Sequence, residues 1–169
     1  PTVPPSGLFA DALSATGYPN ARKLVRDGND VLHWVWPSSN EVLYTTSADG
    51  VIWEPPAALF AADAETGQPA LAADAAQLYL TFASKAGSVN PRIWFARKAL
   101  VDGAGWSEPV VLLGGSYSAA YPTLYCDASG RLHLVAASND DGPSIYYTSS
   151  GDGGQTWAPI QQVYAVTAA

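Results

Sequence analysis

Hydrophobic and polar residues alternate in short runs along most of the chain. Runs such as "VLHWVW" from Val31, "LYLTF" from Leu78 and "LHLVA" from Leu132 place apolar side chains at every second position. This period of two is typical of β-strands, and the Gly, Asn, Asp and Pro residues between the runs are turn residues. An Ala-rich stretch at 59–78 invites a helical assignment, but Gly67 and Pro69 interrupt it. The pattern therefore predicts an all-β chain.

The same pattern of runs occurs three times. "KLVRDGNDVLHWVW" from Lys23 aligns with "TLYCDASGRLHLVA" from Thr123, and "ALAADAAQLYLTF" from Ala70 fits between them with a turn one residue shorter. Each unit ends in a glycine turn and a tryptophan, and these tryptophans are 53 and 51 residues apart. Four strands are predicted in each unit: 24–26, 31–36, 42–46 and 55–60; 71–73, 78–82, 93–97 and 109–113; 124–126, 132–136, 145–149 and 159–163. Four antiparallel strands in about 40 to 50 residues is the pattern of a β-propeller blade.

Two turns carry a more specific signature. "SADGVIW" and "SGDGGQTW" resemble the Asp box, S-x-D-x-G-x-T-W, of the BNR repeats of sialidases and sialidase-like propellers. The matching residues are Ser47, Asp49, Gly50 and Trp53 in the first copy, which is one residue shorter, and Ser150, Asp152, Gly154, Thr156 and Trp157 in the second. The middle turn, "KALVDGAGW", lacks the serine and has Asp102 displaced. The resemblance implies a propeller of BNR type but does not specify an activity.

Because the motif recurs, we interpret its aspartates as structural. A short carboxylate can accept hydrogen bonds from N–H groups that a tight turn leaves unpaired, while glycine takes the left-handed positions. The tryptophans at 53, 106 and 157 are expected to pack against the blades rather than to stack on a sugar. In the family, these turns lie on the face of the disc away from the active site.

The chain divides by this reading into an N-terminal spare outer strand with its linker and three blades. The boundaries are 1–19, 20–66, 67–119 and 120–169. Three blades form only an arc with two open sheet faces, whereas propellers typically have four to eight blades. Two alternatives remain: two chains pair into a six-bladed ring, or the chain is a segment of a longer propeller.

Composition narrows the partners. Eight Lys and Arg against 15 Asp and Glu give a formal charge of −7, which opposes nucleic acid and anionic membranes because binding to phosphate needs clustered cations. The single cysteine, Cys126, is expected to be a small apolar filler, and His33 and His133 fall on the same repeat position, so neither a cofactor nor a metal is predicted. A secreted or cell-surface location is expected, although the first residues lack the form of a signal peptide.

Candidate ligand residues lie in the loops that link the fourth strand to the next first strand, and the second strand to the third. These loops share one face, opposite the Asp boxes, where propellers usually bind ligands. Aromatic rings beside amides and carboxylates suit sugars. The candidates are Arg22 and the following residues, which we expect to be exposed: Tyr18, Trp36, Asn40, Glu65, Arg92, Tyr117, Tyr121, Asn139, Asp140 and Asp141.

Three functional readings stay open. The first is a non-catalytic module that binds glycans or acts as an interaction scaffold. The second is an exo-sialidase-type hydrolase whose site is completed by another chain or by missing sequence. For it the resemblance implies a tyrosine nucleophile with a glutamate, an aspartate acid–base and an arginine triad. No arginine here stands in the F/Y-R-I-P motif, and "PRIW" at Arg92 lacks the final proline. Of the arginines, Arg22 alone is well placed, at the mouth of an inner strand. The third reading is a purely structural repeat.

Overall fold

The computed structural model describes residues 21–38, 40–61, 66–88, 90–138 and 142–165. Every regular element within these ranges is a β-strand, which confirms the all-β prediction. The described residues contain no helix that is long and apolar enough to span a membrane.

Twelve strands form three four-stranded sheets. Sheet 1 contains β1 (Leu24–Arg26), β2 (Leu32–Ser38), β3 (Glu41–Ser47) and β4 (Ala57–Ala61). Sheet 2 contains β5 (Thr66–Ala73), β6 (Gln77–Ser84), β7 (Arg92–Ala99) and β8 (Val110–Leu113). Sheet 3 contains β9 (Ala120–Cys126), β10 (Leu132–Ser138), β11 (Ser144–Ser150) and β12 (Gln161–Ala165).

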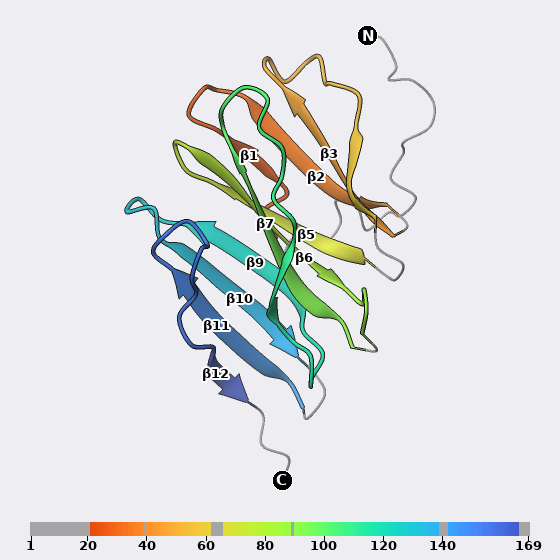
Figure 1. Cartoon of the computed structure of the whole chain (residues 1–169), viewed down its shortest axis with the longest axis vertical. Coiled ribbons are helices and arrows are strands. Elements are labelled where there is room, and N and C mark those ends of the chain that lie inside the picture. The colour runs from red at the N-terminus through yellow and green to blue at the C-terminus, as the bar shows by residue number, and fades with distance from the viewer. Residues whose placement is uncertain (1–20, 39, 62–65, 89, 139–141, 166–169) are drawn as a thin grey trace.

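In each sheet the strands lie in chain order and neighbouring strands are antiparallel. Figure 1 shows the three sheets following one another through the molecule. The first strands of adjacent sheets contact each other, β1 with β5 and β5 with β9. β5 contacts β1 and β2 on one side and β9 on the other. The predicted three units of four antiparallel strands are therefore confirmed.

Two apolar clusters lie between the sheets. We call the face of a sheet that packs against the next sheet its trailing face, and the face that packs against the previous sheet its leading face. The equivalent faces of sheet 3 and sheet 1 take the same names. Between sheets 1 and 2, the buried residues are Val25, Val35, Val42, Tyr44, Leu71, Leu78, Leu80 and Phe82. Between sheets 2 and 3, they include Ala72, Tyr79, Ile93, Phe95, Leu113, Leu124, Leu132 and Leu134. Each fully buried large apolar side chain stabilises the fold by roughly 1.5–3 kcal/mol, so the sheets depend on one another.

The repeated tryptophans belong to these contacts. Trp106 of sheet 2 lies edge-on to Tyr44 of sheet 1, with ring centroids 5.7 Å apart, and Trp157 of sheet 3 lies edge-on to Phe95 of sheet 2 at 5.2 Å. The buried Nε1 atoms of Trp106 and Trp157 have no hydrogen-bond partner. Because this occurs in both copies, we regard it as a feature of the repeat and not as a ligand site.

Candidate functional site

The β3–β4 and β11–β12 turns are held by their aspartates. Oδ1 of Asp49 accepts hydrogen bonds from the N–H groups of Val51 and Ile52, both at 2.8 Å. Oδ1 of Asp152 accepts from the N–H groups of Gln155 and Thr156 at 3.0 and 2.9 Å, and Oδ2 accepts from the Thr156 hydroxyl at 2.6 Å.

These bonds stabilise the charged carboxylates. They lower the pKa of Asp152, chiefly through the Thr156 hydroxyl, and that of Asp49, chiefly through the Ile52 N–H. A carboxylate whose acceptor positions are occupied in this way is suited to holding a turn rather than to proton transfer.

A second repeated network joins the first three strands of sheets 1 and 3. In sheet 1, Asp27 Oδ2 lies 3.2 Å from His33 Nε2, and His33 Nδ1 lies 2.7 Å from the Tyr44 hydroxyl. Burial raises the pKa of Tyr44 to about 12, so the phenol stays protonated at neutral pH. Sheet 3 repeats the arrangement with Asp127, His133 and Tyr147, and in sheet 2 the Tyr79 hydroxyl donates to Asp74. An acid–histidine–tyrosine set could relay protons, but its recurrence at the same position of sheets 1 and 3 identifies it as architecture.

The predicted ligand residues are only partly brought together. Tyr18, Glu65, Asn139, Asp140 and Asp141 lie outside the described residues. Asn40 is exposed, as expected, and Arg22 is exposed as well.

The expectation that Trp36 is exposed is wrong. Its side chain is 5% exposed, packs with the fully buried Leu43, and lies 4.7 Å from the Trp34 ring. Its register with Phe82 and Ala136 places it on the leading face of sheet 1, where it packs in a small cluster with Leu43 and Trp34.

Arg92 is also less available than expected. Its guanidinium donates to the Ala86 carbonyl and lies 5.3 Å from the centre of the Trp94 ring. The side chain therefore fastens the β6–β7 turn to β7 instead of pointing freely from the loop. Tyr117 is half-buried and stacks on Tyr146 with centroids 5.0 Å apart, so it fills space between sheets 2 and 3.

Tyr121 matches its prediction best and has a feature that composition alone did not reveal. It is 45% exposed, and its φ is +54°, in the left-handed region that a bulky residue rarely adopts. Gln68 occupies the equivalent position of sheet 2 with φ of +55°, and its Oε1 accepts a 2.7 Å hydrogen bond from the Tyr121 N–H. The starts of β5 and β9 are thus tied together at the loop end of the sheets.

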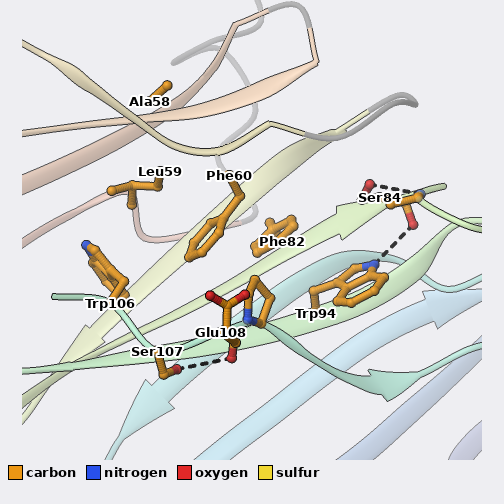
Figure 2. Close-up of a pocket in the computed structure, with 11 residues that line it drawn as sticks. Ala58, Leu59, Phe60, Phe82, Ser84, Trp94, Trp106, Ser107 and Glu108 are labelled. Carbon is orange, nitrogen blue, oxygen red and sulfur yellow. Dashed lines mark hydrogen bonds between the residues drawn. The ribbon is translucent and has the colours of Figure 1, made fainter.

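A groove between sheets 1 and 2 forms a cavity, and none of the described candidate loop residues lines it. Its volume is about 520 Å³, and Figure 2 shows the rings of Phe60, Phe82 and Trp94 around it together with the side chain of Glu108. The other lining residues are Ala58, Leu59, Ser84, Ala86, Trp106, Ser107 and Pro109.

The chemistry of the groove is apolar with one carboxylate. Phe60 of β4 and Phe82 of β6 stack with centroids 5.3 Å apart, and the Trp94 Nε1 donates to the Ser84 carbonyl at 3.4 Å. Glu108 is exposed and is the one charged residue among those lining the groove. At the next interface Tyr117 covers Tyr146, the residue that corresponds to Trp94.

Sequence reasoning missed this groove because its walls come from different sheets. The available signal lies after Trp106, where a serine stands between the tryptophan and the Glu-Pro pair. The corresponding turns of the other units, "WEPP" and "WAPI", have no such serine. No three His, Cys, Asp or Glu side chains are grouped closely enough to hold a metal ion in the described ranges.

Comparison with known proteins identifies the fold. No protein-family model and no curated protein matches the sequence. The Hadza microbial sialidase Hz136 matches with a TM-score of 0.61 and 19% identity over 80% of this chain and 36% of that protein. The endo-arabinase of Bacteroides thetaiotaomicron matches with a TM-score of 0.63 and 14% identity over 86% and 56%. The α-L-arabinofuranosidase PaAbf62A of Podospora anserina, in complex with cellotriose, matches with a TM-score of 0.60 and 14% identity over 79% and 47%.

These likenesses define the class of protein as an all-β propeller segment. The segment is similar in fold to the propellers of sialidases and other glycoside hydrolases, as the Asp-box resemblance predicted. The chain spans between about a third and just over half of these three proteins.

Proposed function

We propose that this chain is a glycan-binding propeller module that does not itself catalyse hydrolysis. The observation that carries the proposal is the groove lined by Phe60, Phe82 and Trp94, with Glu108 at its side. Aromatic rings pack on the C–H faces of sugar rings, and a few polar groups fix the hydroxyls. A volume of about 520 Å³ suits one or two sugar units, since ligand pockets usually hold roughly 300–1,000 Å³. The carbohydrate-active proteins named above support a carbohydrate ligand by analogy of fold.

The ligand class is a neutral glycan. Glu108 is the one charged residue that lines the groove, and the chain carries a formal charge of −7. The guanidinium of Arg92 lies beside Trp94 but donates to the Ala86 carbonyl. The carboxylate of a sialic acid or uronic acid would be placed close to the carboxylate of Glu108, and like charges repel. The hydroxyls of a neutral sugar instead donate to Glu108, and hydrogen bonds to a charged acceptor are the stronger ones.

The absence of hydrolysis is proposed from the arginines. A sialidase-type site, by the resemblance, needs three arginines around one substrate carboxylate. Arg26 pairs with Asp30 at 3.3 Å, Arg97 donates to the Gly153 carbonyl at 3.1 Å, and Arg92 is held by Ala86 and Trp94. These contacts favour structural roles for three of the five arginines. A sialidase whose site is completed by further blades is the second candidate, and the fold similarity to the Hadza sialidase favours it.

A titration of two variants tests the binding site. Calorimetry with cello- and arabino-oligosaccharides, chosen from a glycan array, is expected to show binding that weakens about 3- to 10-fold in Trp94→Ala, because a ring contact is worth roughly 0.5–1.5 kcal/mol. Glu108→Gln is expected to weaken it about 10-fold or more, since a hydrogen bond to a charged group contributes about 1.5–3 kcal/mol. Glu54→Gln, the same change at an exposed glutamate that does not line the groove, is the matched control. Unchanged affinity in both groove variants would contradict the site.

A turnover assay tests the second half of the proposal. The native chain is expected to leave a fluorogenic sialoside intact. Hydrolysis that follows the protein through purification, and that disappears in Tyr121→Phe, would replace the binding module with the enzyme.

A further inference from the structure

The trailing face of sheet 3 corresponds to a face that is covered in sheets 1 and 2, and none of the described strands packs against it. Three positions recur on the trailing faces of the three sheets, one each on the first, second and fourth strands. For sheets 1, 2 and 3 in turn, the residues are Val25, Ala72 and Tyr125 on the first strand, Val35, Thr81 and Val135 on the second, and Phe60, Leu113 and Tyr164 on the fourth.

The burial of these positions differs sharply between sheets. In sheet 1, Val25 and Val35 are 7% and 0% exposed because sheet 2 covers them. In sheet 3, Tyr125, Val135 and Tyr164 are 51%, 38% and 57% exposed. Large apolar side chains exposed together on one face of a sheet indicate a contact with another molecule or segment.

The polar network beneath this face gives the same indication. His33 and Asp27 of sheet 1 are 6% and 3% exposed, whereas His133 and Asp127 of sheet 3 are 29% and 31% exposed. The geometry is nearly the same in both, with imidazole–carboxylate distances of 3.2 and 3.1 Å. Sheet 3 therefore keeps the arrangement of a covered face, although its network is more exposed than that of sheet 1 within the described part of the chain.

The two internal interfaces show what such a cover looks like. In each, the next sheet supplies a leucine from its first strand, a leucine from its second strand and the tryptophan of its outer turn. These residues are Leu71, Leu80 and Trp106 for sheet 2, and Leu124, Leu134 and Trp157 for sheet 3.

Sheet 1 carries the same set on its leading face. Leu24, Trp34 and Trp53 are the equivalent residues; Leu24 is 48% exposed, and the two tryptophans are half-buried and contact each other at 5.7 Å. The outer part of this face, at Trp36 and Leu43, is already buried, so it is Leu24, Trp34 and Trp53 that can meet a partner.

We propose that the trailing face of sheet 3 binds the leading face of sheet 1 of a second copy of this chain. Trp53 of the second copy then lies edge-on to Tyr147, as Trp106 does to Tyr44 and Trp157 to Phe95. Two such contacts join two chains head to tail into a closed ring of six sheets, within the four to eight blades that propellers have. This surface is distinct from the groove, so the proposal does not depend on glycan binding.

The mass in solution tests this contact. Sedimentation from micromolar to millimolar concentration is expected to give twice the 17.7 kDa of the chain. Val135→Arg and Leu24→Arg, one on each half of the contact, are each expected to weaken the dimer about 30-fold or more, because a charge is buried without a partner. Val51→Arg, at a turn residue that is 81% exposed, should leave the dimer intact.

Thermal melts of all four proteins verify that each remains folded. A single-chain mass at every concentration would overturn the proposal, as would a dimer that both charged variants leave unchanged. A mass above two chains would overturn it as well, because the ring would then not close at six sheets.

Discussion

Gly154 illustrates how closely neighbouring sheets fit at the scale of single atoms. It lies in the β11–β12 turn with φ of +80°, and a Cβ added there would lie 2.3 Å from Cζ of Phe95 in sheet 2. Phe95 cannot easily move, since it is 2% exposed and contacts the rings of Tyr79 and Trp157. The glycine is needed both for its backbone conformation and for the approach of the next sheet.

Replacement of Gly154 by alanine is therefore expected to destabilise the fold by about 2–4 kcal/mol. About 1 kcal/mol comes from the left-handed backbone and the rest from overpacking against Phe95. Urea unfolding measures the change. Gly105→Ala is the control, because a Cβ at that turn glycine meets nothing within 4 Å, and a loss of similar size there would contradict the explanation.

At the scale of the element, the turn between the third and fourth strands of a sheet can form with or without the aspartate motif. The β11–β12 turn is organised around Asp152 and Ser150, whose hydroxyl donates to Asp152 at 2.7 Å and accepts from the Gly154 N–H at 2.9 Å. The β7–β8 turn lacks the serine and uses a backbone hydrogen bond from the Ala104 N–H to the Val101 carbonyl at 3.2 Å. The sheet therefore requires a tight turn here, and the motif is one way to stabilise it.

Asp152→Asn is expected to lower the urea midpoint, whereas Asp102→Asn in the turn without the motif should leave it nearly unchanged. The pKa of Asp152 is lowered by its hydrogen bonds, so its contribution is present above the ordinary value of 3.8 and is lost as the pH falls below it. Urea titrations at pH 3 to 7 should thus show a smaller acid loss in Asp152→Asn than in the native chain. Equal acid losses in the two proteins would show that the turn carboxylate does not contribute.

At the scale of the whole molecule, the repeat determines how far sequence reasoning reaches. The alternation of apolar and polar residues and the alignment of the three repeats predicted all three sheets. The same alignment put His33 and His133 at one structural position. The same register places Trp36 with Phe82 on the leading face, but its burial there depends on packing with Leu43 and Trp34. The groove and the Arg92 contact with Trp94 could not be predicted, because they depend on how one sheet packs on the next and on the path of a turn.

The burial of His33 between sheets 1 and 2 makes the stability of the molecule depend on pH. The pKa of His33 is lowered from its ordinary value of 6.5, chiefly because burial disfavours the charged ring; Asp27 opposes this shift and Lys98 adds to it. As the pH falls through about 6.5, the unfolded chain takes up a proton that the folded chain resists, so stability is expected to decrease between about pH 7 and pH 5. The double variant His33→Tyr with Tyr44→Phe reproduces the Tyr79 and Phe95 pair of sheet 2 and removes this imidazole without leaving a cavity. Urea midpoints across this range should be flatter in the double variant than in the native chain. A native slope that persists in the double variant would place the titrating group elsewhere.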